Sequence, residues 1–295
     1  MRLWAVDSFA DRPFRGNPAC VLEPFAAWPD SAWLQTLAAE LRREATAFLL
    51  YTGEPARFGL RWFSPTRELP LCGHGTLAAA HVLASEFGYQ AVIFETASAV
   101  LHATKSHDVY ALRFPASPPS QIDIPSGLAD ALGVEPTEVW SGRYLIAVLG
   151  NEQDVRALRP DIAALKSISL RVTGGSGNVG VAALADPGHP YDVVDRFFAP
   201  GSGIDEDPAT GSLHCMLAPL FSGRLGRARL RYHQAFPGRG GDIECEHRGE
   251  QVLLRGNAVT VYSGELSPEI GDSIRNRARA GAAETRRPAG QAKGP

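Results

Sequence analysis

Two stretches of this chain echo one another and decide its expected architecture. Arg61–Pro65 has the sequence RWFSP, and Arg196–Pro200 has the sequence RFFAP. In each copy a predicted strand ends in an aromatic-small-proline turn and an acidic loop follows. A glycine, Gly73 or Gly211, then opens a helix rich in alanine and leucine. Because a repeated order of elements indicates a repeated structural unit, we expect two copies of one α+β unit.

The echo predicts where a binding site would form. If the two units pack about a pseudo-twofold axis, the helices that begin at Gly73 and Gly211 present their N-termini to each other across the interface. Each N-terminus has free backbone N–H groups and a partial positive charge. A cleft between them would attract an anion such as a carboxylate.

The composition is that of a globular protein with a small-molecule partner. The chain has 295 residues, of which 44% are hydrophobic and 21% charged, and this length allows two domains or one large one. The 29 basic and 32 acidic residues give a net charge of −3. This balance gives no electrostatic footprint for nucleic acid or an anionic membrane, so we expect neither as a partner.

A proline-rich segment divides the chain into its expected domains. Pro115–Ser120 (PASPPS) breaks both the helical and the strand periodicity. We predict an N-terminal domain over residues 1–118 and a C-terminal domain over residues 119–275. Residues 276–295 form a basic tail without large apolar side chains, which we expect to be disordered. The tail lacks interleaved aromatic residues, which disfavours nucleic-acid binding through it.

The termini and the cysteines predict a soluble, cytoplasmic protein. Asp7 lies where a secretory signal would have its apolar core. The most apolar stretch, Thr76–Val92, contains polar and charged residues and falls short of the roughly 18 uncharged residues of a membrane span. The four cysteines are Cys20, Cys72, Cys215 and Cys245. They are far apart and form no CxxC pair, so we expect reduced thiols.

Local patterns predict the elements that carry the echo. Short strands are expected at Leu3–Val6 and Ala19–Leu22, and a helix that begins at Asp30 or Ser31 should end near Arg43. A buried strand, Ala45–Leu50, follows it. Further strands are expected at Phe58–Phe63, Ala91–Phe94, Val109–Phe114, Ala228–Tyr232 and Val252–Leu254, and helices near Gly75–Glu86, Ala129–Leu132 and Gly211–Ser222.

Four motifs, in this order along the chain, resemble a known family. They are Phe14–Ala19 (FRGNPA), Arg43–Phe48 (REATAF), Leu71–Leu77 (LCGHGTL) and Gly203–Ser212 (GIDEDPATGS). Together they resemble the PhzF-like isomerase family of the phenazine-biosynthesis type, which has the diaminopimelate-epimerase-like fold. The resemblance extends over nearly the whole chain except the tail.

The resemblance implies a fold, an activity and a set of site residues. The expected fold is α+β, with two pseudo-symmetric domains, each a mixed sheet wrapped around a central helix, and an active site between them. Family members are homodimers that need no metal or organic cofactor. Glu44 matches the family's acid/base glutamate, which moves a proton between atoms of the substrate. Five further residues match positions that line the pocket: His74, Asp207, Gly73, Gly211 and Ser212.

The residue types alone allow a functional and a structural interpretation at each position. Glu44 lies at the mouth of an apolar strand, where burial would raise its pKa toward the range of a general base, but it could also be a solvated helix-end residue. His74 could bind or protonate a substrate heteroatom as a neutral imidazole, or only cap or pack the first helical turn. Asp207 could orient His74 or hold a substrate amine or hydroxyl, or be an Asp-Pro turn residue. Ser212 could donate to a substrate carboxylate or cap its helix.

Cys72 raises a second chemical possibility. Related epimerases use two cysteines, one on each face of the substrate carbon, and Cys72 matches the position of the first. Thr210 occupies the corresponding position in the second half, and Cys215 lies beyond it, inside a predicted helix. A cysteine-dependent epimerase or racemase is therefore the disfavoured alternative, and we expect Cys72 to be a small side chain that packs at the substrate pocket.

Other sites are weaker possibilities. A metal site would need Cys72, His74, His81, His214 and Cys215 to converge, and no HExxH or paired CxxC spacing supports one. Gly175–Gly180 (GSGNVG) fits the dinucleotide fingerprint, but the apolar run after it is too short for the required helix, so we interpret it as a turn before a strand. The resemblance implies a cofactor-independent isomerase, which we expect to act on a small, carboxylate-bearing, cyclic or amino-acid-like substrate. A non-catalytic metabolite-binding or interaction protein with the same fold is the alternative from another class.

Overall fold

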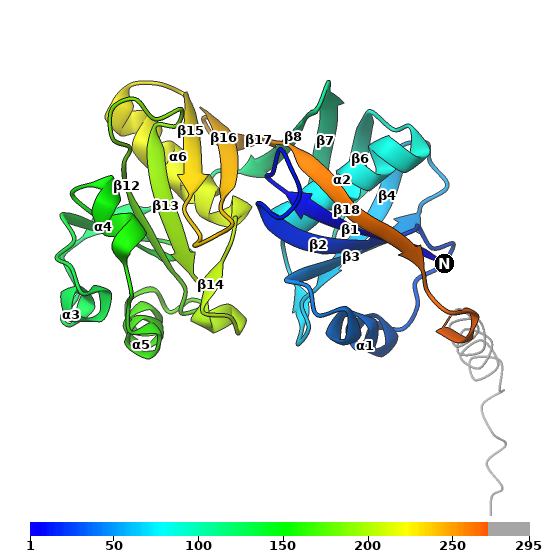
Figure 1. Cartoon of the computed structure of the whole chain (residues 1–295), viewed down its shortest axis with the longest axis horizontal. Helices are drawn as coiled ribbons and strands as arrows, with labels where there is room; N and C mark the ends of the chain where they lie inside the picture. The colour runs from blue at the N-terminus through cyan, green and yellow to red at the C-terminus, as the bar shows by residue number, and fades with distance from the viewer. Residues whose placement is uncertain (271–295) are drawn as a thin grey trace, which may run out of the picture.

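The computed structural model describes residues 1–270, which form two lobes side by side along the longest axis (Figure 1). The elements of the first lobe are β1 (Arg2–Ser8), β2 (Asn17–Leu22), α1 (Ser31–Leu41), β3 (Ala45–Tyr51), β4 (Arg57–Phe63), β5 (Glu68–Leu69), α2 (Gly73–Phe87), β6 (Ala91–Glu95), β7 (Val100–Ser106) and β8 (Val109–Pro115). The predicted tail, residues 276–295, lies outside the described residues.

The second lobe repeats this order with two additional short α-helices and one 3-10 helix. Its elements are β9 (Ser120–Ile122), α3 (Leu128–Leu132), β10 (Glu138–Ser141), β11 (Leu145–Val148), α4 (Glu152–Ala157), α5 (Ile162–Thr173), β12 (Val179–Leu184), β13 (Val193–Phe198), η1 (Pro200–Ser202), β14 (Glu206–Asp207), α6 (Gly211–Leu225), β15 (Arg229–Gln234), β16 (Gly241–Arg248) and β17 (Gln251–Gly256). The last described strand is β18 (Ala258–Glu265).

The hydrogen-bonding pattern of the strands is the same in the two lobes. In the first, β1–β2 is antiparallel, β2–β3 parallel, β3–β4 antiparallel and β4–β6 parallel. In the second, β10–β11, β11–β12, β12–β13 and β13–β15 follow the same sequence of directions. The predicted duplication of a mixed α+β unit is therefore confirmed by the strand pairing.

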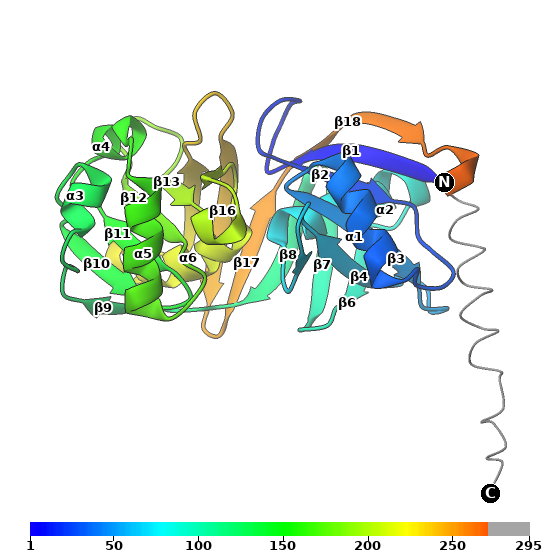
Figure 2. The ribbon, with the colours of Figure 1, turned by 90° about the horizontal axis from the view of Figure 1, so that it is seen from below.

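Each lobe contains one strand that continues from the last hairpin of the other. β18 follows β17 of the second lobe and pairs antiparallel with β1, whereas β9 follows β8 of the first lobe and pairs with β10. β8 and β17 also pair with each other and join the two sheets (Figure 2). The chain therefore crosses between the lobes in both directions. The domain boundaries at residues 118 and 275 stay predictions. β18 lies within the predicted C-terminal domain, but its hydrogen bonds place it in the first sheet.

Each sheet curves around one central helix. α2 buries most of its residues and contacts β1, β2, β3, β7 and β8. α6 occupies the equivalent place against β15, β16 and β17. Small residues let the sheet curve closely around the helix, because each alanine adds little volume between helix and strands. The expected sheet around a central helix is present in both lobes.

The end of α1 positions the chain for the site. Asp30 caps this helix by accepting a hydrogen bond from the Trp33 amide, as its sequence predicts. The apolar face of α1 packs on Phe25, Phe48 and other core residues. The helix ends at Leu41, and Arg42 adopts the left-handed conformation with φ 50°. This turn brings Glu44 to the start of β3.

Other expectations have mixed outcomes. The predicted strands and helices are present with small changes in their ends, and Gly175–Gly180 is a turn that leads into β12, as expected. Helices α4 and α5 are not among the predicted elements, although Asp161 provides a helix-capping side chain for α5. Within residues 1–270, no helix is long and apolar enough to span a bilayer. A cytoplasmic location stays a prediction.

Candidate active site

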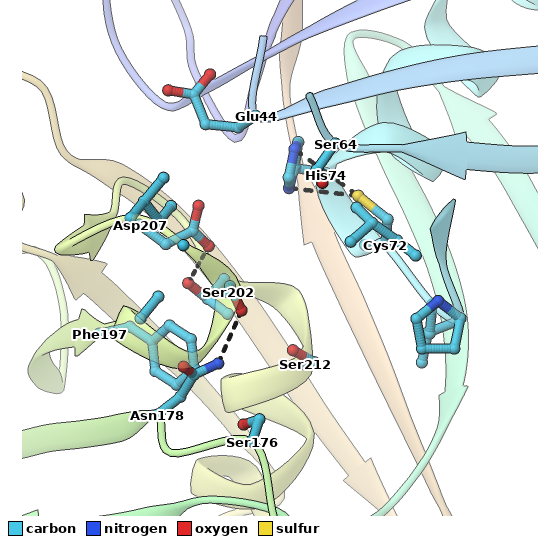
Figure 3. Close-up of a pocket in the computed structure, with 18 of the residues that line it drawn as sticks. Glu44, Ser64, Cys72, His74, Ser176, Asn178, Phe197, Ser202, Asp207 and Ser212 are labelled. Atoms are coloured by element: carbon cyan, nitrogen blue, oxygen red, sulfur yellow. Dashed lines mark hydrogen bonds between the residues drawn. The ribbon is translucent and has the colours of Figure 1, made fainter. Parts of the chain in front are cut away.

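The predicted site residues line one cavity between the two lobes (Figure 3). The cavity has a volume of about 620 Å³. Its walls include all seven predicted residues: Glu44, Cys72, Gly73, His74, Asp207, Gly211 and Ser212. The first four come from the first lobe and the other three from the second, so the cavity depends on the way in which the lobes are packed.

The two glycine-opened helices meet at this cavity, as the echo predicts. A Cβ atom placed on Gly73 would lie 3.2 Å from the Cα atom of Gly211, and one placed on Gly211 would lie 3.3 Å from the Cα atom of Gly73. α2 and α6 therefore begin in direct backbone contact. Gly73 and Gly211 both line the cavity, and a helix N-terminus favours an anion such as a carboxylate.

Glu44 lies at the entrance of β3 and is half-buried. Burial raises the pKa of its carboxyl group, while the charges of Arg239 and Arg43 lower it and that of Asp7 raises it. A carboxyl group with a raised pKa holds and releases a proton closer to neutral pH than an exposed glutamate does. Glu44 is therefore partly removed from solvent, and its role as the acid/base group stays a prediction.

His74 is buried and neutral. Burial lowers the pKa of its imidazole to about 4. Its Nδ1 atom lies 3.2 Å from the side-chain nitrogen of Asn17, which can only donate. The two hydrogens of this nitrogen also have closer acceptors, Asp207 Oδ1 and the Ala209 carbonyl oxygen, at 2.7 and 2.8 Å. The helix cap at this end is Cys72, whose Sγ accepts from the Gly75 amide, so His74 is not needed as a cap.

Asp207 is held by three polar side chains. Its Oδ2 accepts a hydrogen bond of 2.5 Å from Thr210 Oγ1, and its Oδ1 accepts one of 2.7 Å from Asn17 Nδ2. Gln234 fixes this segment, because its amide accepts from the Thr210 N–H and donates to the Asp207 carbonyl. Burial raises the pKa of the Asp207 carboxyl group to about 7, although both hydrogen bonds favour the ionised form.

An Asp207→Asn variant should gain stability relative to the wild type as the pH rises from about 4 to about 8. Because the folded-state pKa of Asp207 is raised to about 7 from 3.8, the folded protein binds this proton more tightly. The stability that it contributes is complete below about pH 4 and is lost as the pH rises through about 7. About three pKa units correspond to at most about 4 kcal/mol, and the hydrogen bonds from Thr210 and Asn17 reduce the gain.

Urea unfolding of both proteins across this pH range measures the difference. Asp11→Asn, at an exposed position, is the control for removing one carboxylate. A difference between Asp207→Asn and the wild type that does not change with pH would show that Asp207 is ionised throughout.

Asn17 is a site residue that the sequence reasoning does not single out. Its side chain is fully buried, and its Nδ2 lies near His74 Nδ1, Asp207 Oδ1 and the Ala209 carbonyl at 3.2, 2.7 and 2.8 Å. His74 and Asp207 are therefore connected through Asn17. The signal for it was the motif Phe14–Ala19, which resembles the family's turn and contains this asparagine.

Cys72 is buried in a setting that does not favour a thiolate. Burial raises the pKa of its thiol to about 12. Cys215 is also buried, and its thiol donates to the Gly211 carbonyl within α6. Thr210 lines the cavity at the position that corresponds to Cys72, and its hydroxyl donates to Asp207. Two thiols facing one substrate carbon are therefore not found among residues 1–270.

The second lobe adds a polar and aromatic wall that the sequence does not predict. Tyr144 and Phe197 pack edge to face with ring centroids 4.8 Å apart. The Tyr144 hydroxyl lies 2.9 Å from Ser212 Oγ, within the first turn of a helix whose cap is Thr210, so Ser212 is not the cap. The turn 175–180 contributes Ser176 and Asn178 to the wall, close to Ser202 (Figure 3).

The histidines of the metal hypothesis point to different partners. His81 contacts the hydroxyls of Tyr110 and Thr260, and His214 contacts Asp195 and the Thr210 carbonyl. Among residues 1–270, a group with ligand atoms close enough for a metal is Glu152, Asp186 and His189, on the surface of the second lobe. The Glu152 carboxylate already accepts from Arg156, Tyr191 and a backbone amide.

Comparisons with known proteins agree with this geometry. The family model PhzC-PhzF, described as phenazine biosynthesis-like protein, matches residues 6–264. An uncharacterized isomerase of Pseudomonas aeruginosa is 40% identical over 268 residues, covering 90% of this chain and 98% of that protein. Phenazine biosynthesis-like domain-containing protein 1 of Mus musculus is 33% identical over 288 residues, covering 90% and 98%.

Solved structures show the same architecture. A phenazine biosynthesis protein of the PhzF family from Enterococcus faecalis superposes with a TM-score of 0.83 at 36% identity, covering 90% of this chain and 98% of that chain. A predicted epimerase from Pseudomonas aeruginosa shares the fold, with a TM-score of 0.68 at 24% identity and the same coverage. This chain therefore belongs to the PhzC-PhzF family of phenazine biosynthesis-like proteins and is an isomerase with the diaminopimelate-epimerase-like fold.

Proposed function

We propose that this isomerase moves a proton on a small carboxylate-bearing substrate, cyclic or amino-acid-like, with Glu44 as the general acid/base and without a metal or organic cofactor. The observation that supports it most is the convergence of Glu44, His74 and Asp207 with the two helix N-termini on one cavity. Anion binding and proton transfer are thereby available at the same place.

The substrate carboxylate would bind between Gly73 and Gly211. Their helix N-termini would supply N–H donors and a positive electrostatic potential. The Ser212 hydroxyl, in the first turn of α6, would be a further hydrogen-bond donor. The contact between the two backbones limits this end of the cavity. A carboxylate held here is oriented for chemistry at the neighbouring carbon.

Glu44 would take a proton from one carbon as a carboxylate and return it at another position as a carboxylic acid. The pair of electrons left by the C–H bond stays in the substrate, and the returning proton forms the new bond, so the reaction is balanced without an oxidant. Its raised pKa suits Glu44 to both steps. Neutral His74 would bind or protonate a substrate heteroatom, and Asp207 would hold an amine or hydroxyl. A homodimer is the expected assembly.

Solvent-deuterium exchange tests this function. The purified protein is incubated in D₂O with a panel of cyclic carboxylates and amino acids, and deuterium at carbon is measured by ¹H NMR and mass spectrometry. We expect incorporation into at least one compound. Binding without incorporation across the panel would instead support a metabolite-binding protein.

A Cys72→Ala variant is expected to exchange deuterium at close to the wild-type rate. The buried thiol has its pKa raised to about 12 and has no second thiol opposite it among the cavity residues, so it is poorly suited to proton transfer. The same NMR assay measures the effect, with Cys245→Ala as the control for removing a buried thiol elsewhere. A loss of about a hundredfold or more would favour the cysteine-dependent alternative.

A further inference from the structure

Two loops from different lobes are joined beside the active site. The guanidinium of Arg239, in the β15–β16 loop, donates to the Asp7 carboxylate of β1 and to the carbonyl oxygens of Gly16 and Arg15, the last two at 2.9 and 3.2 Å. The Gly16 amide donates in return to the Gly240 carbonyl at 2.6 Å. Asp7 is almost completely buried, so this ion pair is shielded from solvent on one side.

The β1–β2 loop is held by the buried Phe9 at its start and by these polar contacts at its end. Its residues Phe9, Phe14 and Gly16 all have positive φ angles, and a Cβ on Gly16 would lie 2.0 Å from the Ser8 carbonyl oxygen. Phe14 is 72% exposed, so its ring contributes little apolar packing to the loop. Its amide instead donates to the second oxygen of Asp7 at 2.7 Å. A loop with unfavourable backbone angles keeps its shape only where its surroundings hold it.

The residue that follows this loop is Asn17. Its amide nitrogen contacts His74 of the first lobe and Asp207 and the Ala209 carbonyl of the second. Asn17 begins β2, where it is paired with Ser8 of β1, and it directly follows Gly16, which Arg239 and Gly240 hold. A continuous set of contacts therefore runs from the ion pair to His74 and Asp207.

We propose that the Asp7–Arg239 ion pair is a positioning element of the active site: it fixes the β1–β2 loop against the second lobe and thereby holds Asn17 between His74 and Asp207. Its effect on turnover rests on the proposed function, whereas the positioning itself does not. Arg239 and Asp7 touch no substrate in this proposal and act through Asn17.

The ion pair also sets the charges around Glu44. The charges of Arg43, Arg239 and Asp7 shift the pKa of Glu44. The charge of Glu44 in turn raises the pKa values of Cys20 and Asp207. Arg239 lowers the pKa of Glu44, and Asp7 raises it. Removing either Arg239 or Asp7 breaks the same ion pair, but the two removals should shift the titration of Glu44 in opposite directions. A loss of structure alone would not separate them in this way.

NMR on the full-length protein tests the proposal without a substrate. The variants are Arg239→Met, Asp7→Asn and Arg239→Lys. Selective ¹⁵N-asparagine labelling reports the solvent exchange of the Asn17 side-chain amide, assigned by its loss in Asn17→Ala. Labelling of the glutamate carboxyl carbon with ¹³C reports the titration of Glu44, assigned by its loss in Glu44→Gln. Arg224→Met removes another arginine–carboxylate ion pair, a more exposed one with Glu138 away from the cavity, and is the control.

We expect the Asn17 amide to exchange about tenfold faster or more in Arg239→Met and in Asp7→Asn, as for the loss of a charge-assisted hydrogen bond. The pH at the midpoint of the Glu44 titration should rise in Arg239→Met and fall in Asp7→Asn. Arg239→Lys keeps the charge but not the forked contacts, so it should leave the midpoint near the wild-type value and still accelerate Asn17 exchange. Arg224→Met should change neither.

Two results would overturn the proposal. Asn17 exchange at the wild-type rate in folded Arg239→Met and Asp7→Asn proteins would show that the ion pair does not position this residue. Glu44 midpoints that move in the same direction in both variants would show that the charges do not act on the site as a pair. If Arg239→Met does not fold, Arg239→Lys and Asp7→Asn decide the first result. If the NMR results agree but no substrate exchanges deuterium, the proposed function fails and the positioning stands.

Discussion

A Glu44→Gln protein is expected to fold normally and to lose exchange of the substrate C–H proton by about a thousandfold. General acid/base catalysis by one positioned side chain contributes about 10²–10⁴-fold, and glutamine keeps the shape of glutamate but cannot carry the proton. Burial already favours the neutral form of Glu44, so a neutral amide should cost little stability. The measurement is the rate of deuterium incorporation with the compound that the wild type labels.

The design separates catalysis from other effects of the substitution. Glu40→Gln, at an exposed position on α1 just before Glu44, is the matched control and should keep the wild-type rate. Binding of the same compound to Glu44→Gln is measured by titration calorimetry, because a loss of chemistry should leave affinity largely intact. Wild-type exchange by folded Glu44→Gln would exclude Glu44 as the acid/base group.

Local pattern in the sequence predicts much of the fold. The echo of Arg61–Pro65 in Arg196–Pro200 predicts the duplicated unit, because strand, turn and helix start are all encoded within a short segment. The exchange of β9 and β18 between lobes leaves no such signal. Those strands pair with β10 and β1, and the choice of a pairing partner depends on contacts between residues far apart in the chain.

The site residues also fall into two groups: those that the sequence predicts and those that only the folded structure brings together. Gly73 and Gly211 follow from the echo, and Glu44, His74 and Asp207 match motifs of a known family. Asn17 could not be found from spacing, because it lies 190 positions from Asp207, to which it donates a hydrogen bond. The ion pair that holds the Asn17 loop spans a still longer separation. Convergence of this kind is a property of the folded chain and has no counterpart in a single local motif.

Substitutions at the contact between the two helix N-termini should have the second large effect on deuterium exchange. A Gly73→Val variant should lose at least about a hundredfold in deuterium exchange, since a misplacement of about 1 Å near the reacting groups can cost this much. A Cβ at Gly73 already lies 3.2 Å from the Cα atom of Gly211, tighter than an ordinary contact, and the branched methyl groups of valine extend further. The backbones of α2 and α6 must then move apart, because backbone atoms cannot rotate away as a side chain does.

Graded variants test whether this separation is the cause. Gly73→Ala should have a smaller effect in the same direction, and Gly73→Val should also lower the free energy of unfolding by about 1–3 kcal/mol through overpacking. Gly223→Val, on α6 with open space around its Cβ position, is the control for placing valine on a central helix. Urea unfolding and deuterium exchange are measured for all three. Full exchange activity in Gly73→Val would mean that the carboxylate does not depend on the closeness of the two helix N-termini, and the binding mode proposed for the substrate would be wrong.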